Sequence, residues 1–121
     1  MGVAQKGKRK LEHNGRSYFW YVQQNDEDYG RMSLNIVSED KKFIVSFLVA
    51  QSVENKTPHI VIKGLEFVGL ENHDRTGWVR VQTPTWDDQV ITPGLVKKII
   101  EWCLSPKEQL VFVDWNGNLI Q

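Results

Sequence analysis

The sequence has little cysteine and no long hydrophobic run, and both absences narrow the class of protein. Its one cysteine is Cys103, so no disulfide can form within the chain. No stretch approaches the roughly 20 apolar residues that a membrane-spanning helix needs. No apolar segment follows the basic residues near the N-terminus, as a secretory signal peptide would require. We therefore expect a cytoplasmic protein with a reduced thiol and no membrane partner.

An excess of charge of either sign is also lacking, because 15 basic residues are balanced by 15 acidic residues. A neutral protein has no overall field that attracts phosphate, which argues against nucleic acid as a partner. Basic residues are concentrated only in the polar segment 1–10, at Lys6, Lys8, Arg9 and Lys10. We predict that residues 1–10 form a flexible basic tail and that residues 11–121 form a single domain.

Motifs of catalysis and cofactor binding are missing as well. The sequence has no Gly-rich phosphate loop, no Cys and His cluster with zinc-ligand spacing, no HExxH and no GxSxG. Its three histidines are far apart in the chain. We therefore assign no catalytic residue, no metal ligand and no cofactor, and the sequence favours a protein that is not an enzyme.

The sequence does contain one well-marked helix, predicted at about residues 92–104. Thr92 suits the N-cap because its hydroxyl accepts a hydrogen bond from the first turn, and Pro93 suits the first helical position. Apolar residues then recur at spacings of three and four, and Cys103 falls on the apolar side. Pro106 marks the end of the helix. A helix of about three turns is marginal alone in water, so it must pack against a sheet.

The rest of the chain has the pattern of short strands joined by turns. Asn14-Gly15 predicts a hairpin, because both central positions of a type I′ turn need positive φ. A second pair, Asn116-Gly117, predicts a C-terminal hairpin. The predicted fold class is α+β. It consists of a mostly antiparallel, curled sheet of about six or seven strands in meander order, packed by one helix and closed by a C-terminal strand or hairpin.

The best candidate for a ligand-binding site lies around the loop that precedes the helix. Trp78, Trp86, Asp87 and Asp88 are close together in the chain, and His73 lies in a polar turn shortly before them. Tryptophan beside acidic residues is typical of a surface that stacks a sugar, a peptide or a base. The alternative is structural, because indole rings also cover the ends of sheets and Asp is favoured in turns and near helix N-termini.

These observations predict a non-catalytic binding or protein-interaction module whose partner is a protein or a small ligand. Two strands are apolar on both faces, so a second copy of the chain is also a candidate partner, in a homodimer. One alternative is a small enzyme with an Asp/His acid–base pair from the loops at 73–74 and 87–88. Another alternative is nucleic-acid contact through the basic N-terminal tail.

Overall fold

A computed structural model describes residues 8–25, 31–49, 58–64, 66–70, 78–86, 91–106 and 110–114. These residues form an antiparallel sheet and one helix. The strands are β1 (Arg9–His13), β2 (Arg16–Asn25), β3 (Arg31–Ser38), β4 (Ile44–Leu48), β5 (His59–Ile62) and β6 (Val79–Gln82), and the helix is α2 (Pro93–Cys103).

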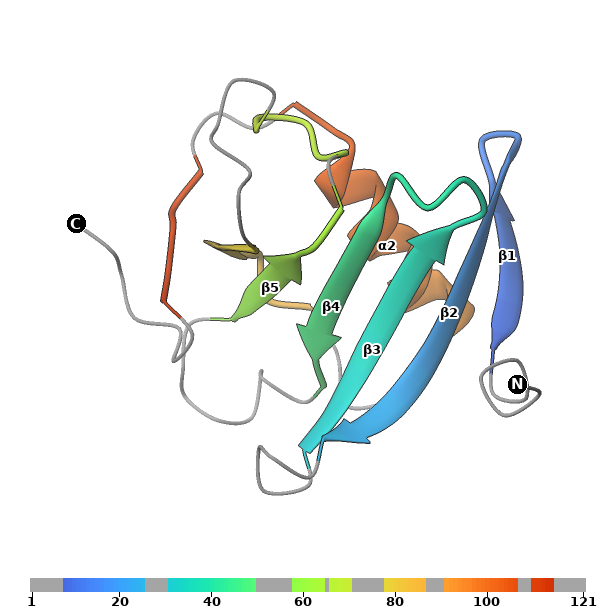
Figure 1. The fold of residues 1–121 in the computed structure, drawn as a ribbon, viewed down its shortest axis with the longest axis horizontal. Helices are drawn as coiled ribbons and strands as arrows, with labels where there is room; N and C mark the ends of the chain where they lie inside the picture. The colour runs from blue at the N-terminus through green and yellow to red at the C-terminus, as the bar shows by residue number, and fades with distance from the viewer. Residues whose placement is uncertain are drawn as a thin grey trace.

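The six strands follow one another across the sheet in the order of the sequence, β1-β2-β3-β4-β5-β6 (Figure 1). Every neighbouring pair is antiparallel. Asn14 and Gly15, between β1 and β2, have φ angles of 53° and 76°, as a type I′ hairpin turn requires. The predicted α+β class and meander order are confirmed. The described strands form an open sheet, with β1 at one edge and β6 at the other.

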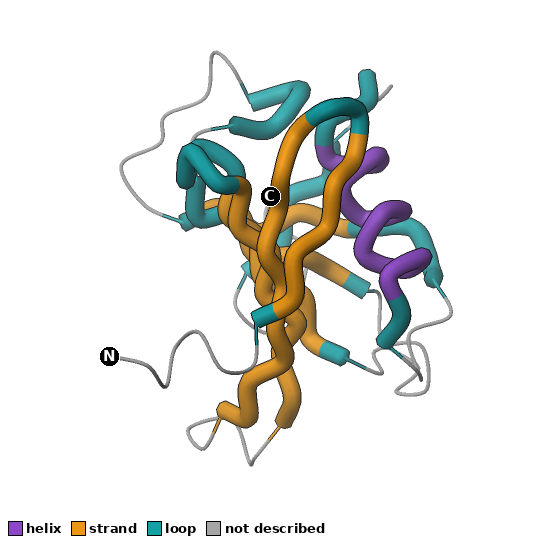
Figure 2. The backbone as a smooth tube through the Cα atoms, turned by 90° about the vertical axis from the view of Figure 1, so that its right-hand side faces the viewer, coloured by secondary structure: helices purple, strands orange, loops and turns teal. Residues whose placement is uncertain are grey.

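The helix α2 lies across one face of the sheet (Figure 1, Figure 2). The Thr92 hydroxyl accepts a hydrogen bond from the backbone N–H of Leu95 at 3.1 Å, and Pro93 begins the helix. The buried side chains of the helix are Leu95, Val96, Ile99, Ile100 and Cys103. The predicted N-cap, apolar side and buried thiol are therefore confirmed.

The hydrophobic core lies between α2 and the sheet face that it covers. Successive residues of a strand point to opposite faces, so alternate side chains enter the core. Trp20, Ile36, Val45 and Ile62 are register partners across four strands, and all are buried. Removing such side chains from water contributes roughly 25 cal/mol per Å² of apolar area, which holds a helix that is too short to be stable alone.

The structure describes the chain only between Lys8 and Asp114, with internal gaps. Val81 of β6 and Phe112 form an isolated antiparallel bridge, so the last described segment runs beside this edge strand. The predicted hairpin at Asn116-Gly117 lies outside the described residues. In the part of the chain that is described, no helix combines the length and the hydropathy needed to span a membrane.

Candidate functional site

The sheet has a second face, which lies on the side away from α2 (Figure 1, Figure 2). Directly paired residues of antiparallel strands point to the same side, so the register defines a row of side chains across this face. From β2 to β6 the row consists of Tyr21, Asn35, Ser46, Val61 and Arg80. We call this surface the open face, since no helix of the described chain covers it.

Aromatic rings with cations beside them lie at both ends of the open face. At the β2 end, Nζ of Lys8 is 5.5 Å from the ring centroid of Tyr21. At the β6 end, Nζ of Lys63 is 4.5 Å from the ring centroid of Trp78. Trp78 is 61% exposed, and both distances are within the range of cation–π attraction. The open face therefore presents aromatic and basic groups together.

Lys63 and Arg80 form a pair of like charges. Partial burial lowers the pKa of Lys63, and the positive charge of Arg80 lowers it further. The ion pairs among the described residues involve neither Lys63 nor Arg80. A negatively charged ligand at this place would relieve the repulsion between the two side chains.

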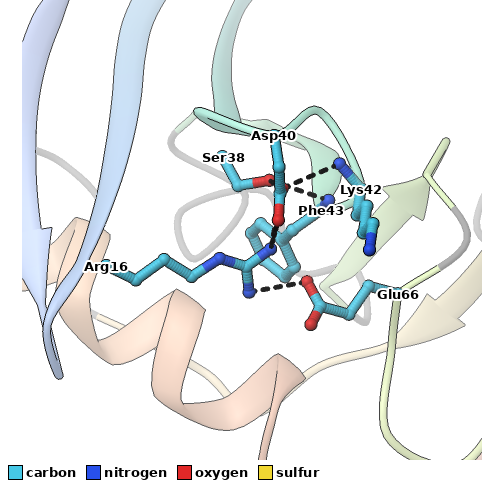
Figure 3. Close-up of polar contacts among 6 residues, drawn as sticks. All are labelled: Arg16, Ser38, Asp40, Lys42, Phe43 and Glu66. Atoms are coloured by element: carbon cyan, nitrogen blue, oxygen red, sulfur yellow. Dashed lines mark hydrogen bonds and ion pairs between the residues drawn. The ribbon is translucent and has the colours of Figure 1, made fainter.

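A second polar cluster, the Arg16 network, consists of Arg16, Ser38, Asp40 and Glu66 (Figure 3). Nη2 of Arg16 donates to both carboxylate oxygens of Asp40, at 2.9 and 3.1 Å, and Nη1 lies 2.7 Å from Oε1 of Glu66. The Ser38 hydroxyl donates to Asp40 at 2.5 Å and accepts from the backbone N–H of Phe43 at 3.0 Å. The network thus ties the β1–β2 hairpin to the β3–β4 turn and to the segment that contains Glu66.

The charges within the Arg16 network compensate one another. Hydrogen bonds from the Ser38 hydroxyl, the Lys42 backbone N–H and Arg16 hold the pKa of Asp40 well below its usual range. Burial disfavours the Arg16 charge, but the hydrogen bonds with Asp40 and Glu66 outweigh this and raise its pKa. A guanidinium that already binds two carboxylates has little capacity left for an external anion. We therefore interpret this network as structural.

The structure places the two predicted tryptophans on opposite sides of the sheet. Trp86 is half-buried, and its ring centroid lies 5.6 Å from that of Phe47 and 5.9 Å from that of Trp102 on α2. Trp86 therefore packs on the helix side, where Phe47 belongs to the core. Trp78 instead contacts Lys63 on the open face. The two indoles do not share one described surface.

The predicted acidic residues and histidine of the candidate site, Asp87, Asp88 and His73, lie outside the described residues, as does Asp74 of the alternative acid–base pair. Their roles remain predictions. Among the residues that the structure does describe, no three His, Cys, Asp or Glu side chains gather as metal ligands would.

Two residues of the open face, Lys63 and Arg80, were not predicted from the sequence as site residues. The alternation in β6 contained a signal for Arg80, because Val79 and Val81 on either side of it are core residues. No sequence pattern indicated that Lys63 would meet Trp78. That contact depends on the register of β5 with β6.

The fold and the site define a two-layer α+β protein with one helix-covered sheet face and one face that carries aromatic and basic groups. Comparison of the chain with models of protein families, with curated proteins and with solved structures gave no match.

Proposed function

We propose that the protein is a non-catalytic binding module and that an anionic ligand binds on the open face of its sheet. The observation that carries this proposal is the group formed by Lys63, Arg80 and the exposed Trp78. Lys63 and Arg80 lie next to an exposed ring and form no ion pair with a described carboxylate. The repulsion between these two cations lowers the stability of the folded protein. Such a repulsion is typical of a binding site for a negatively charged ligand, because the bound ligand relieves it.

Charge complementarity also favours an anionic ligand over a second copy of the chain. By register and ring contact, the charged side chains described on the open face are Lys8, Lys10, Glu12, Lys63 and Arg80, four basic and one acidic. Two copies that met through this face would bring like charges together, which opposes association. The proposal therefore assigns the open face to a ligand and leaves the predicted homodimer without support from this surface.

We retain two finer features of the predicted fold within this proposal, the curl of the sheet and the C-terminal hairpin. The backbone N–H of Val113 donates to the carbonyl of Arg80 at 3.0 Å, so the segment that precedes the predicted hairpin runs next to a proposed ligand-binding residue. A hairpin that continues from this segment would border the open face at its β6 end.

Titration with inorganic tripolyphosphate, followed by the amide NMR signals, tests the proposed site. We expect shifts at Tyr21, Val61 and Arg80, which are spread along the open face, and none along α2. Replacement of both cations in the K63Q/R80Q variant should weaken binding about two- to thirtyfold, because each partly exposed charge pair is worth only about 0.2–1 kcal/mol.

The matched control is the K97Q/K98Q variant, which removes two exposed positive charges from α2. It should bind tripolyphosphate as tightly as the wild-type protein does. Equally weakened binding in the two variants, or shifts confined to α2, would show that binding is only a response to overall charge and would refute a site on the open face.

A further inference from the structure

We infer that the ligand of the open face is a single-stranded nucleic acid, with a base stacked on Trp78 and phosphates near Lys63 and Arg80 at one end and near Lys8 at the other. This inference rests on the proposed function and assigns a ligand class to the same surface. The neutral net charge of the whole chain does not oppose it, because the described open face has an excess of cations.

The dimensions of the open face suit several nucleotides. Tyr21 and Arg80 belong to the same row and are separated by four strand-to-strand steps. Each step is about 4.8 Å, so the row is roughly 19 Å long. At the duplex spacing of about 3.4 Å per nucleotide this corresponds to about six nucleotides, and to fewer in an extended strand. One molecule can therefore reach the cations at both ends.

The aromatic side chains favour a ligand that has rings as well as negative charge. Lys63 lies against one face of the Trp78 indole, and most of the side chain is still exposed to solvent. Bases stack on exposed aromatic rings without regard to sequence. An acidic peptide could use the same cations, but its carboxylates would gain nothing from the indole surface.

The middle of the row carries neutral polar side chains between the two cationic ends. Asn35 is only 8% exposed, and among the described residues its side chain donates one long hydrogen bond, from Nδ2 to the carbonyl of Ser33 at 3.4 Å. At this exposure the amide is largely enclosed by its neighbours, so Asn35 makes the middle of the row neutral without itself reaching a ligand. Ser46 lies next to it in the row and adds a hydroxyl. Bases can therefore lie over an uncharged middle, with the half-buried Ser46 beside them, while phosphates approach the cationic ends.

The test compares oligothymidylate and oligouridylate of about ten nucleotides with an abasic oligonucleotide of the same length and with polyglutamate of the same charge, by fluorescence anisotropy. We expect both ordinary oligonucleotides to bind about tenfold or more tightly than the abasic strand, because each stacked base contributes to affinity. Replacement of the indole in Trp78→Ala should weaken binding of the ordinary strands about tenfold and leave binding of the abasic strand unchanged.

Two controls separate base stacking from other effects. Met32→Ala truncates another exposed apolar side chain, at 41% exposure, on the opposite face of the sheet, and should leave binding unchanged. K63Q/R80Q should reduce the slope of log affinity against log salt by about 1.4, because each phosphate of a single strand that the protein neutralises adds about 0.7 to this slope.

The outcomes distinguish this inference from the proposed function. Equal affinity for abasic and ordinary strands, or tighter binding of polyglutamate, would overturn the nucleic-acid assignment, while tripolyphosphate shifts on the open face would still support an anion site. Absence of binding to every one of these polyanions would overturn both.

Discussion

Asp40 is the side chain whose protonation the structure restrains most clearly. It accepts hydrogen bonds from the Ser38 hydroxyl, the Lys42 backbone N–H and Arg16, and each of them favours the ionised carboxylate. Because the pKa of Asp40 is lower in the folded than in the unfolded chain, its contribution to stability is present above the unfolded pKa, about 3.9. That contribution disappears as the pH falls from there toward the folded pKa.

We predict that Asp40→Asn lowers the melting temperature at neutral pH and removes part of the acid sensitivity of the fold. The wild-type melting temperature should fall as the pH drops below about 5, because Asp40 takes up a proton in the unfolded chain while the folded carboxylate stays ionised. The variant should show a smaller fall over the same range, as measured by circular dichroism. Glu39→Gln removes a neighbouring exposed carboxylate and serves as the control. Parallel pH profiles for wild type and Asp40→Asn would contradict this role.

At the scale of single elements, the end of β5 lies unusually close to the start of β4. The backbone N–H groups of Lys63 and Gly64 both donate to the carbonyl of Ile44, at 2.9 and 3.0 Å. A Cβ atom on Gly64 would lie 2.5 Å from the carbonyl oxygen of Lys42 and 2.7 Å from the nitrogen of Ile44. Both neighbours are backbone atoms, so they cannot move aside as a flexible side chain would. Glycine at this position allows the contact that also places Lys63 on the open face.

We predict that Gly64→Ala lowers the free energy of unfolding by about 1–3 kcal/mol, the usual range for forcing atoms into a packed site. The matched control is Gly94→Ala in the first turn of α2, where the nearest atom to the new Cβ would be 3.7 Å away. Alanine is the better helix former, so this variant should be unchanged or up to about 1 kcal/mol more stable. Urea unfolding of both variants provides the measurement. Equal free energies for the two would show that the backbone at Gly64 can relax.

At the scale of the whole molecule, an aromatic cluster connects the sheet to the C-terminal half of α2. Trp102 makes edge contacts with Trp86 at 5.9 Å and with Phe67 at 5.7 Å, and Trp86 in turn contacts Phe47 of β4. Aromatic pairs at such distances add about 0.5–1.5 kcal/mol each beyond the area that they bury. Segments that are far apart in the chain are held together in this way.

We predict that Trp86→Ala and Trp78→Ala affect different properties. Trp86→Ala should lower the free energy of unfolding by about 2–3 kcal/mol, somewhat less than the value for a fully buried tryptophan. Trp78→Ala removes an exposed ring and should change it by no more than about 0.5 kcal/mol. Urea unfolding followed by far-ultraviolet circular dichroism measures both. A large decrease for Trp78→Ala and none for Trp86→Ala would reverse the roles assigned to the two indoles.

The candidate site could be predicted only in part. Trp78 was identified because its polar neighbours suggested exposure, and the structure shows it exposed. Its partner Lys63 lies 15 positions earlier in the chain and was not identified, because no local pattern connects the two. The same reason applies to Arg16, Asp40 and Glu66, which come from three separate segments.

The sequence by itself determined the features that depend on neighbours within a few positions. The helix limits follow from Thr92, Pro93 and Pro106, the first hairpin turn follows from Asn14-Gly15, and the core positions of the strands follow from alternation. Only the tertiary structure decided which outward side chains meet. Strand register sets those meetings, and it depends on the packing of all six strands beneath α2, which is a non-local property. The chemistry of the open face therefore became visible only once the strands were placed side by side.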